Sequence, residues 1–143
     1  MTDLSGIIAI DPGPEESAFC YELGGALFAD KVPNEQLLAR LQAFRSWHLA
    51  IEMIASYGMP VGESVFETCV WIGRFIQLHG GSYRKIYRKD VKMHLCGSMR
   101  AKDSNVRQRL LDLYGKPLTK GFSGDMWAAL GVLTTAGDTQ GPA

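Results

Sequence analysis

The 143-residue sequence lacks the features of a membrane or secreted protein. No apolar run approaches the roughly 20 residues that cross a bilayer. The apolar run at 7–10 is too short for a signal-peptide core, and no basic segment precedes it. Cysteine is scarce: Cys20, Cys69 and Cys96 are odd in number and widely spaced, which favours free thiols over a disulfide framework. We therefore expect a cytoplasmic protein with no membrane partner.

Motifs for common cofactors are also lacking. The histidines and cysteines show no spacing typical of a zinc site. Gly24-Gly25 is typical of a hairpin turn and Gly80-Gly81 of a helix end, so neither is the glycine loop that cradles a nucleotide phosphate. We expect no nucleotide cofactor.

An excess of charge of one sign is absent, because 15 basic and 15 acidic side chains cancel. Their distribution is uneven, however. Residues 1–73 hold three basic and ten acidic side chains, whereas residues 74–120 hold twelve basic and three acidic ones. A basic pole of this kind can bind a polyanion locally while the total charge stays neutral. A solvated basic face without a partner is the alternative.

The pattern of apolar residues predicts one α/β domain over residues 1–136, followed by a flexible tail over 137–143. Three strands joined by turns indicate an antiparallel meander, and the helix–strand alternation that follows adds parallel strands. We predict a mixed five-stranded sheet with helices on both faces. The expected strands are 5–10, 17–23, 26–32, 47–54 and 83–87, and the expected helices are 34–44, 63–78, 90–95, 104–115 (capped by Ser104) and one that starts at Ser123 or Asp125.

Three acidic residues stand where acids are costly. Asp11 ends the apolar first strand, Glu52 interrupts the apolar fourth strand, and Asp125 opens an apolar helix. Carboxylates near a core are rarely retained without a cation or hydrogen bonds. If the first and fourth strands are neighbours, all three meet at one sheet edge. Three clustered carboxylates repel unless a divalent cation lies between them, and hard oxygen ligands suit Mg²⁺ or Mn²⁺.

Each acid also has a purely structural interpretation. Asp11 lies in Asp-Pro-Gly, which is a good turn on propensity alone. Glu52 can be a strand-end glutamate paired with an arginine, and Asp125 an acid favoured by the helix dipole. If the chain has no metal site, all three of these structural interpretations have to be correct at the same time.

Four segments resemble, in order, the motifs of the RuvC family of Holliday junction resolvases, which are crossover junction endonucleases with a ribonuclease H-like fold. The resemblance covers nearly the whole chain, and the short length together with the departures given below favours a phage-type member. The segments are IAIDPG (8–13), AIEMIASYGMPVGESVFETCVWIGRF (50–75), RKDVKMHLCGSMRAKDSNVRQRLL (88–111) and SGDMWAALGV (123–132).

The resemblance implies that Asp11, Glu52 and Asp125 bind metal. In the hypothesis that follows, two divalent ions, Mg²⁺ or Mn²⁺, support hydrolysis of a DNA phosphodiester to a 5′ phosphate and a 3′ hydroxyl. Lys102, with Arg100 as a weaker candidate, would neutralise the phosphate. Other basic side chains would bind backbone phosphates without reading sequence. They are Arg84, Lys85, Arg88, Lys89, Lys92, Arg107 and Arg109.

Three positions depart from the family pattern. Phe122 stands where a fourth metal ligand is expected, and Asp103 stands where a catalytic lysine is expected, with Lys102 beside it. Ala55 stands where an aromatic wedge is expected, and Tyr57 or Met59 can take that role. These departures bear on metal affinity and on strict specificity for four-way junctions.

Symmetric nicking of a two-fold symmetric junction needs two active sites, so we expect a homodimer. Phe66, Val70 and Trp71 lie outside the main apolar stripe of their helix and can form its interface, with core packing as the alternative. Two other functions stay open: a catalytically inactive branched-DNA-binding protein, and a ribonuclease H-like nuclease that acts on other substrates.

Overall fold

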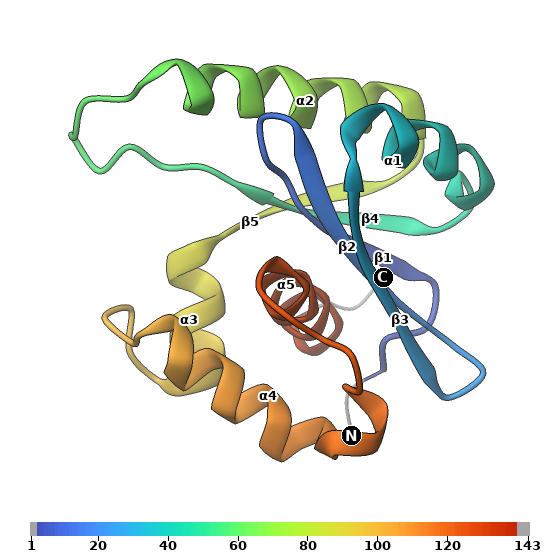
Figure 1. The fold of residues 1–143 in the computed structure, drawn as a ribbon, viewed down its shortest axis with the longest axis vertical. Coiled ribbons are helices and arrows are strands. Elements are labelled where there is room, and N and C mark those ends of the chain that lie inside the picture. The colour runs from blue at the N-terminus through green and yellow to red at the C-terminus, as the bar shows by residue number, and fades with distance from the viewer. Residues whose placement is uncertain (1–2, 140–143) are drawn as a thin grey trace.

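The computed structural model describes residues 3–139. The chain forms five strands, five α-helices and one 3-10 helix, which Figure 1 shows in chain order. The elements are β1 (Ile7–Asp11), β2 (Glu16–Leu23), β3 (Ala26–Pro33), α1 (Asn34–Arg40), η1 (Leu41–Phe44), β4 (His48–Met53), α2 (Glu63–His79), β5 (Tyr83–Tyr87), α3 (Arg88–Cys96), α4 (Asp103–Leu118) and α5 (Asp125–Asp138).

The strands form a single sheet in the order β3-β2-β1-β4-β5. β1, β2 and β3 pair antiparallel, whereas β4 pairs parallel with both β1 and β5. The predicted mixed five-stranded sheet with an antiparallel meander is therefore confirmed. The parallel pairing of β1 and β4 also confirms the condition that brings Asp11 and Glu52 to one edge.

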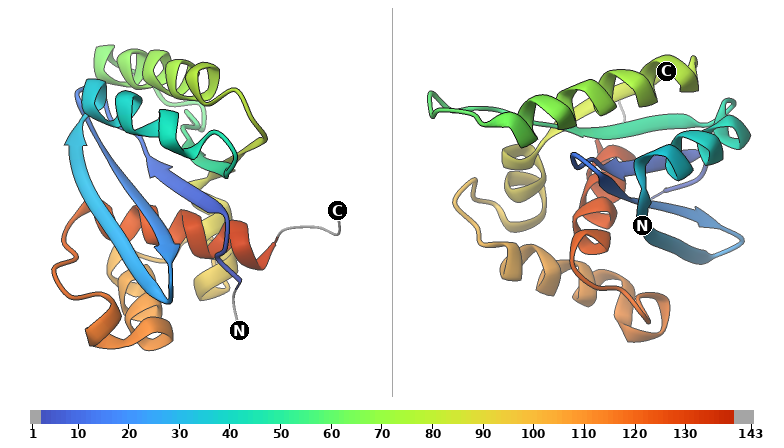
Figure 2. Two further views of the ribbon diagram at one scale, coloured as in Figure 1. Left: turned by 90° about the vertical axis from the view of Figure 1, so that its right-hand side faces the viewer. Right: turned by 45° about the horizontal axis from the view of Figure 1, so that its top comes forward.

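Helices cover both faces of the sheet, as predicted (Figures 1 and 2). On one face α1, η1 and α2 bury an aliphatic and aromatic cluster that includes Ile8, Ile10, Ile51 and Phe75. On the other face α5 runs across the sheet, with α3 and α4 packed outside it. Alternate residues of each strand point to opposite faces, so each central strand contributes to both clusters.

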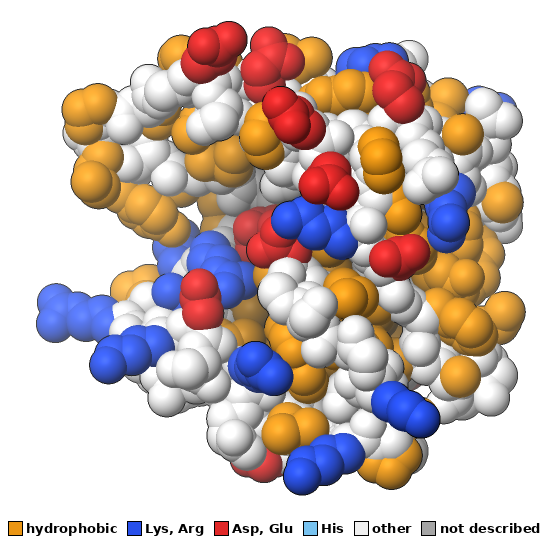
Figure 3. All heavy atoms as spheres, in the orientation of Figure 1, with side chains coloured by type: hydrophobic (Ala, Val, Ile, Leu, Met, Phe, Trp, Pro, Cys, Tyr) orange, Lys and Arg blue, Asp and Glu red, His pale blue; other side chains and the backbone are white. Residues whose placement is uncertain are grey.

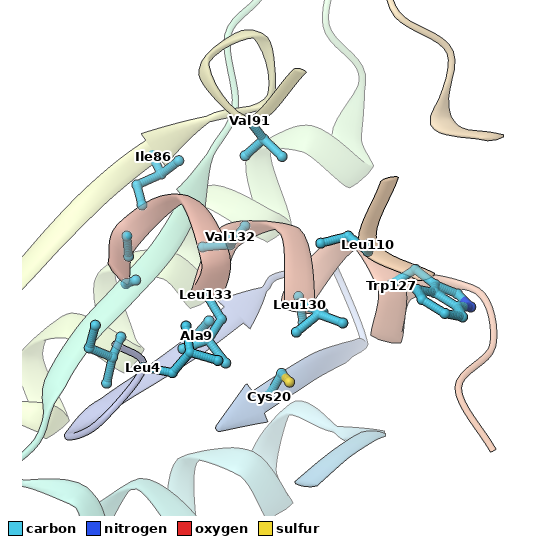
Figure 4. Close-up of a cluster of buried hydrophobic side chains, with 14 of the residues drawn as sticks. Leu4, Ala9, Cys20, Ile86, Val91, Leu110, Trp127, Leu130, Val132 and Leu133 are labelled. Carbon is cyan, nitrogen blue, oxygen red and sulfur yellow. The ribbon is translucent and has the colours of Figure 1, made fainter. Parts of the chain in front are cut away.

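The sheet face that α5 covers carries small side chains, which let the helix pack close to the strands. Ala9 of β1 pairs with Ala50 of β4, and both side chains are fully buried. In Figure 4, Leu130 and Leu133 of α5 lie against Ala9 and its neighbours. Because alanine leaves only a methyl group between a strand and the helix above it, α5 lies close to the two central strands.

Several boundaries differ from the sequence prediction. α4 begins at Asp103 with Lys102 as its N-cap residue, not at a Ser104 cap, because Asn105 Oδ1 accepts the Lys102 backbone N–H at 2.9 Å. α3 starts at Arg88, two residues before the expected position. α5 continues to Asp138, so the described part of the expected tail is helical up to that residue, and residues 140–143 lie outside the described range.

The apolar stripe predicted for this helix, through Val61, Val65, Cys69, Ile72 and Ile76, is partly wrong. The buried residues of α2 are Thr68, Ile72, Phe75 and His79, so Ile72 is buried as predicted, whereas Val65, Cys69 and Ile76 are only partly buried and Val61 lies before the helix. The buried face is thus rotated from the predicted one. Buried His79 explains the shift, because its ring Nε2 lies 3.0 Å from the Phe44 carbonyl oxygen and holds α2 against η1.

The three cysteines are free thiols, as expected. Within residues 3–139, no helix combines the length and the apolar character that a bilayer crossing demands.

Candidate metal and phosphodiester site

The two strand-end carboxylates converge because of the register of the sheet. Ile10 pairs with Ile51, so Asp11 and Glu52, the next residues, lie side by side. By the alternation of side chains, Asp11 follows Ala9 and Glu52 follows Ala50 onto the face covered by α5. A row across the sheet therefore places Asp11 and Glu52 beneath the helix that Asp125 begins.

The Asp11 and Glu52 carboxyl groups are largely buried and lie close enough to act on each other's ionisation. Burial and the neighbouring carboxylates of Glu52 and Asp125 together raise the pKa of Asp11 to about 8. Burial also raises the pKa of Glu52. Two adjacent, largely buried carboxyl groups with raised pKa values are a usual sign of a functional site.

Asp125 is the third acid, and it has an ion-pair partner that the sequence prediction missed. Its Oδ2 accepts a hydrogen bond from Lys31 Nζ at 2.8 Å, and both side chains are about half exposed. Asp11 pairs with Ala18, and Ala18 with Lys31, so Lys31 belongs to the same row across the sheet. The hairpin turn at Gly24-Gly25 fixes that register, and counting back from it could have placed Lys31 near Asp11.

Arg88 is the cation beside Glu52. Its Nη1 lies 3.6 Å from Glu52 Oε1, and its Nη2 donates a hydrogen bond to Asp103 Oδ1 at 2.5 Å. Burial alone would lower the pKa of Arg88, but the hydrogen bond to Asp103 and the nearby Glu52 carboxylate raise it overall. Arg88 directly follows Tyr87, which pairs with Met53, so β5 carries it to the same sheet edge.

The loop after β1 is held by buried polar side chains. Ser17 and Asn34 are each 1% exposed. The Ser17 hydroxyl donates to Asn34 Oδ1 and accepts the Gly13 N–H at 3.1 Å, while Asn34 Nδ2 donates to the Gly13 carbonyl at 2.9 Å. A Cβ at Gly13 would lie 2.3 Å from the Glu16 carbonyl oxygen, so only glycine fits there. This network fixes the backbone directly after Asp11.

The donor set fits a divalent metal at its centre. Glu52 Oε1 is buried with no hydrogen-bond partner in the described chain, and the raised pKa values of Asp11 and Glu52 reflect negative charge that a cation can offset. Hard carboxylate oxygens suit Mg²⁺ or Mn²⁺. In the described residues no group of three or more acidic, histidine or cysteine side chains is drawn together tightly enough to hold an ion. Asp125 would have to leave Lys31 to join the other two carboxylates.

Phe122 provides no fourth ligand. Its ring packs edge-on against Trp127, with ring centroids 5.5 Å apart, in the apolar layer at the start of α5. The position expected to bear a ligand is therefore part of the core.

The predicted DNA-binding side chains do not form one continuous set. Lys89, Arg100, Lys102, Arg107 and Arg109 are exposed on α3, the loop 97–102 and α4. Figure 3 shows basic side chains gathered beside a hollow whose inner end is acidic, between the loop after β4 and the α3–α4 region.

Of the predicted DNA-binding residues, Arg84 lies far from the acids and Arg107 is engaged in a contact within the protein. Arg84 Nη1 donates to Thr139 Oγ1 at 2.7 Å, beyond the end of α5 that is remote from Asp125. With 14 residues, α5 is about 20 Å long. The Arg107 guanidinium stacks over the Trp127 ring at 5.1 Å.

Lys102 and Lys92 lie on either side of Asp103. Lys102 is exposed at the N-cap of α4, and within residues 3–139 no ion pair joins it to the three acids. Lys92 Nζ is 3.8 Å from Asp103 Oδ1. Lys102 directly precedes Asp103, whose side chain accepts a hydrogen bond from Arg88, while Lys85 is exposed on β5.

The loop between β4 and α2 exposes apolar side chains. Tyr57 and Met59 are 64% and 70% exposed, whereas Ala55 is partly buried. Met59 N donates to the Ser56 carbonyl, and the central residues of this turn, Tyr57 and Gly58, both have positive φ. An aromatic residue in the left-handed region is strained, and such strain is often retained at functional sites.

The chain has the fold of RuvC structures. It is similar to the Thermus thermophilus RuvC structure, with 20% identity, a TM-score of 0.65 and 90% of this chain and 91% of that chain covered. It is also similar to T. thermophilus RuvC in complex with a Holliday junction substrate, with 16% identity, a TM-score of 0.66 and 90% of each chain covered. No family model matches the sequence. No curated protein matches it either. The predicted ribonuclease H-like fold is confirmed.

Proposed function

We propose that this protein is a divalent-metal-dependent endonuclease that nicks branched DNA, with four-way junctions as its substrate and a 5′ phosphate and 3′ hydroxyl as its products. The observation that carries the proposal is the pair of adjacent, largely buried carboxyl groups of Asp11 and Glu52 beneath the helix that Asp125 begins. The likeness in fold to a RuvC solved with a Holliday junction supports the choice of substrate.

Asp11, Glu52 and Asp125 are the residues that would hold Mg²⁺ or Mn²⁺. A metal held there would supply an activated water and would offset the negative charge on the phosphate. To bind it, Asp11 and Glu52 would have to be deprotonated, and Asp125 would have to give up its ion pair with Lys31. The Lys31 ammonium would then stay beside the site, where its charge would offset that of an incoming phosphate.

The basic side chains on α3, the loop 97–102 and α4 would bind the arms of the junction. Lys89, Arg100 and Lys102 are exposed on α3 and the loop 97–102, and Figure 3 shows basic side chains beside the acidic hollow. Such contacts give affinity and salt dependence without sequence preference. Tyr57 at the tip of its turn is the aromatic that would stack on bases at the branch point.

The homodimer that symmetric nicking requires would use α2. Phe66 and Val70 are 60% and 55% exposed, which excludes the core-packing alternative for these two side chains. Trp71 is partly buried and packs on Phe75 and beneath Arg74. Light scattering should give a dimer mass for the wild type and a monomer mass for Phe66→Asp, and a monomeric wild type would contradict this part of the proposal.

The deciding experiment uses a labelled mobile four-way junction with Mg²⁺. The wild type should make symmetric nicks, and Asp11→Asn and Asp125→Asn should lose them while they still bind the junction. Asp112→Asn removes an exposed acid on α4 that accepts only from Gln108, and it should nick like the wild type. Nicking that survives Asp11→Asn would overturn the proposal.

A catalytically inactive junction-binding protein is the second candidate. It is favoured by the apolar packing of Phe122 and by the Lys31–Asp125 ion pair, which both oppose metal binding. Binding without nicks in the same assay would support it. A panel of flaps, forks and RNA–DNA hybrids tests the third possibility, a nuclease of this fold with another substrate.

A further inference from the structure

One basic side chain lies inside the carboxylate site and not along its rim. The Arg88 side chain is 29% exposed, and its Nη1 faces Glu52 Oε1 at 3.6 Å, too far for a hydrogen bond. Within residues 3–139 neither of these two buried atoms has a hydrogen-bond partner. Buried donors are rarely left unfilled. Arg88 Nη1 can therefore donate a hydrogen bond to an oxygen atom of a bound substrate.

Asp103 restricts where the guanidinium of Arg88 can lie. It accepts a hydrogen bond from Arg88 Nη2 at 2.5 Å, and this bond lowers the pKa of Asp103. Asp103 is the first residue of α4 and Arg88 the first residue of α3, so the contact ties two helix starts together. With Nη2 occupied by Asp103, Nη1 stays directed at the carboxylate cluster.

A phosphodiester that enters this site is repelled by the three carboxylates, and a cation in the site offsets that repulsion. Lys31 is taken by Asp125 at 2.8 Å and is itself about half exposed on the edge strand β3. Arg88 has a fixed and buried Nη1 donor that faces Glu52 without a hydrogen bond within residues 3–139, and its charge suits a phosphate oxygen.

We propose that Arg88 is a catalytic residue whose Nη1 contacts the reacting phosphate, and that Asp103 is a positioning residue that holds Arg88 there. This inference rests on the proposed phosphodiesterase function. The inference also gives Asp103 a role in the site, because Asp103 holds the Arg88 guanidinium in place.

Nicking rates on the four-way junction test both roles. Arg88→Ala should lower the maximal nicking rate by about 10²- to 10³-fold, as expected for loss of a donor to a charged reaction centre. Arg88→Lys should keep part of the rate, because the positive charge remains while the Nη1 donor held in place by Asp103 is lost. Asp103→Asn should lower the rate about tenfold, and Arg88→Ala/Asp103→Asn should be no slower than Arg88→Ala alone. Arg45→Ala and Asp112→Asn, exposed and outside the site, are the charge-matched controls.

Junction binding in EDTA supplies a readout independent of nicking. Arg88→Ala should reduce the slope of log affinity against log salt by about one, because one phosphate contact is lost. Asp103→Asn removes a negative charge, so junction affinity should be unchanged or higher although nicking is slower. These opposite directions distinguish positioning from simple repulsion of DNA by Asp103.

Three outcomes overturn the inference: Arg88→Ala nicks as fast as Arg45→Ala, Asp103→Asn nicks faster than the wild type, or the effects of the two substitutions add. If the wild type nicks no branched DNA, the proposed function fails, and an unchanged salt slope in Arg88→Ala then rejects the phosphate contact as well. Should Arg88→Ala fail to fold, Arg88→Lys and Asp103→Asn carry the same test, with thermal melts as the measure of folding.

Discussion

The two faces of the sheet are made by the same strands but have different roles: one packs against helices and the other carries the candidate site. Beneath α1 and α2, alternate residues of β1 and β4 are Ile8, Ile10, Leu49 and Ile51, which only pack. Beneath α5 the paired residues Ala9 and Ala50 are small, and the next residues on that face are Asp11 and Glu52. One face therefore holds the strands in place while the other presents groups that are costly to bury. The comparison separates substitutions that destabilise the fold from those that abolish the site.

The largest contrast should come from adjacent residues of β4. Ile51→Ala leaves a cavity in a fully buried position and should lower the free energy of unfolding by about 2–5 kcal/mol. Glu52→Gln should lower junction nicking by at least about 10³-fold, because a metal ligand and charge are lost, with the free energy of unfolding at pH 8 unchanged or higher. Urea unfolding and nicking rates measure the two effects. Strong destabilisation by Glu52→Gln would contradict the division between the faces.

The pH dependence of stability should come from the α5 face. The pKa of Asp11 in the folded protein is about 8, above its ordinary value of 3.8, so the folded chain holds a proton that the unfolded chain releases. In metal-free buffer this contribution is complete below about pH 4 and is lost as the pH rises to about 8. In Asp11→Asn the loss of folding stability with rising pH should be smaller. This variant should also melt at a higher temperature than the wild type at pH 8.

If the proposed site binds metal, added Mg²⁺ at pH 8 should raise the melting temperature of the wild type and leave Asp11→Asn unchanged, because a metal would bind only the folded, deprotonated site. Melting curves in EDTA at pH 5 and pH 8 provide the comparison. A wild type whose stability is the same at both values would show that the carboxyl pair does not hold the proton.

A smaller effect is expected at the network that joins β2 to α1 behind Asp11. Asn34→Ala leaves the buried Ser17 hydroxyl and the Gly13 carbonyl without a partner and should cost about 1–3 kcal/mol. Nicking should also slow, since the loop after Asp11 loosens. Combined with Ser17→Ala, the losses in unfolding free energy should be less than additive. Full additivity would mean that the two side chains act separately.

The smallest effect on stability is expected at the turn after β4. Tyr57→Asn suits the positive φ of 52° and should leave stability unchanged or raise it by up to about 1 kcal/mol. Junction nicking should fall, because the exposed ring is lost. Tyr57→Phe keeps the ring and is the control. Equal nicking by the two variants would remove Tyr57 from the junction contact.

The sequence predicted the fold well because strand periodicity and turn residues are local signals. The positions of Asp11, Glu52 and Asp125 followed from strand and helix ends, and the structure pairs Asp11 with Glu52. The Lys31–Asp125 contact was missed because it depends on a register counted across three strands. Arg88 was expected to line the DNA path, but its contacts to Glu52 and Asp103 join three segments that no local pattern connects. The buried face of α2 was misassigned because a histidine and a threonine occupy positions that hydropathy gives to solvent.

The alanines beneath α5 have a consequence for chemistry as well as for packing. Ala9 and Ala50 determine the thickness of the layer between helix and strands, and Asp125 moves with the first turn of that helix. Two methyl groups thus set the gap that the proposed metal ion would fill between Asp125 and the strand-end acids. Enlarging either residue by a methylene or two would lift the helix and shift the preference of the site toward a wider cation, with no change to any ligand.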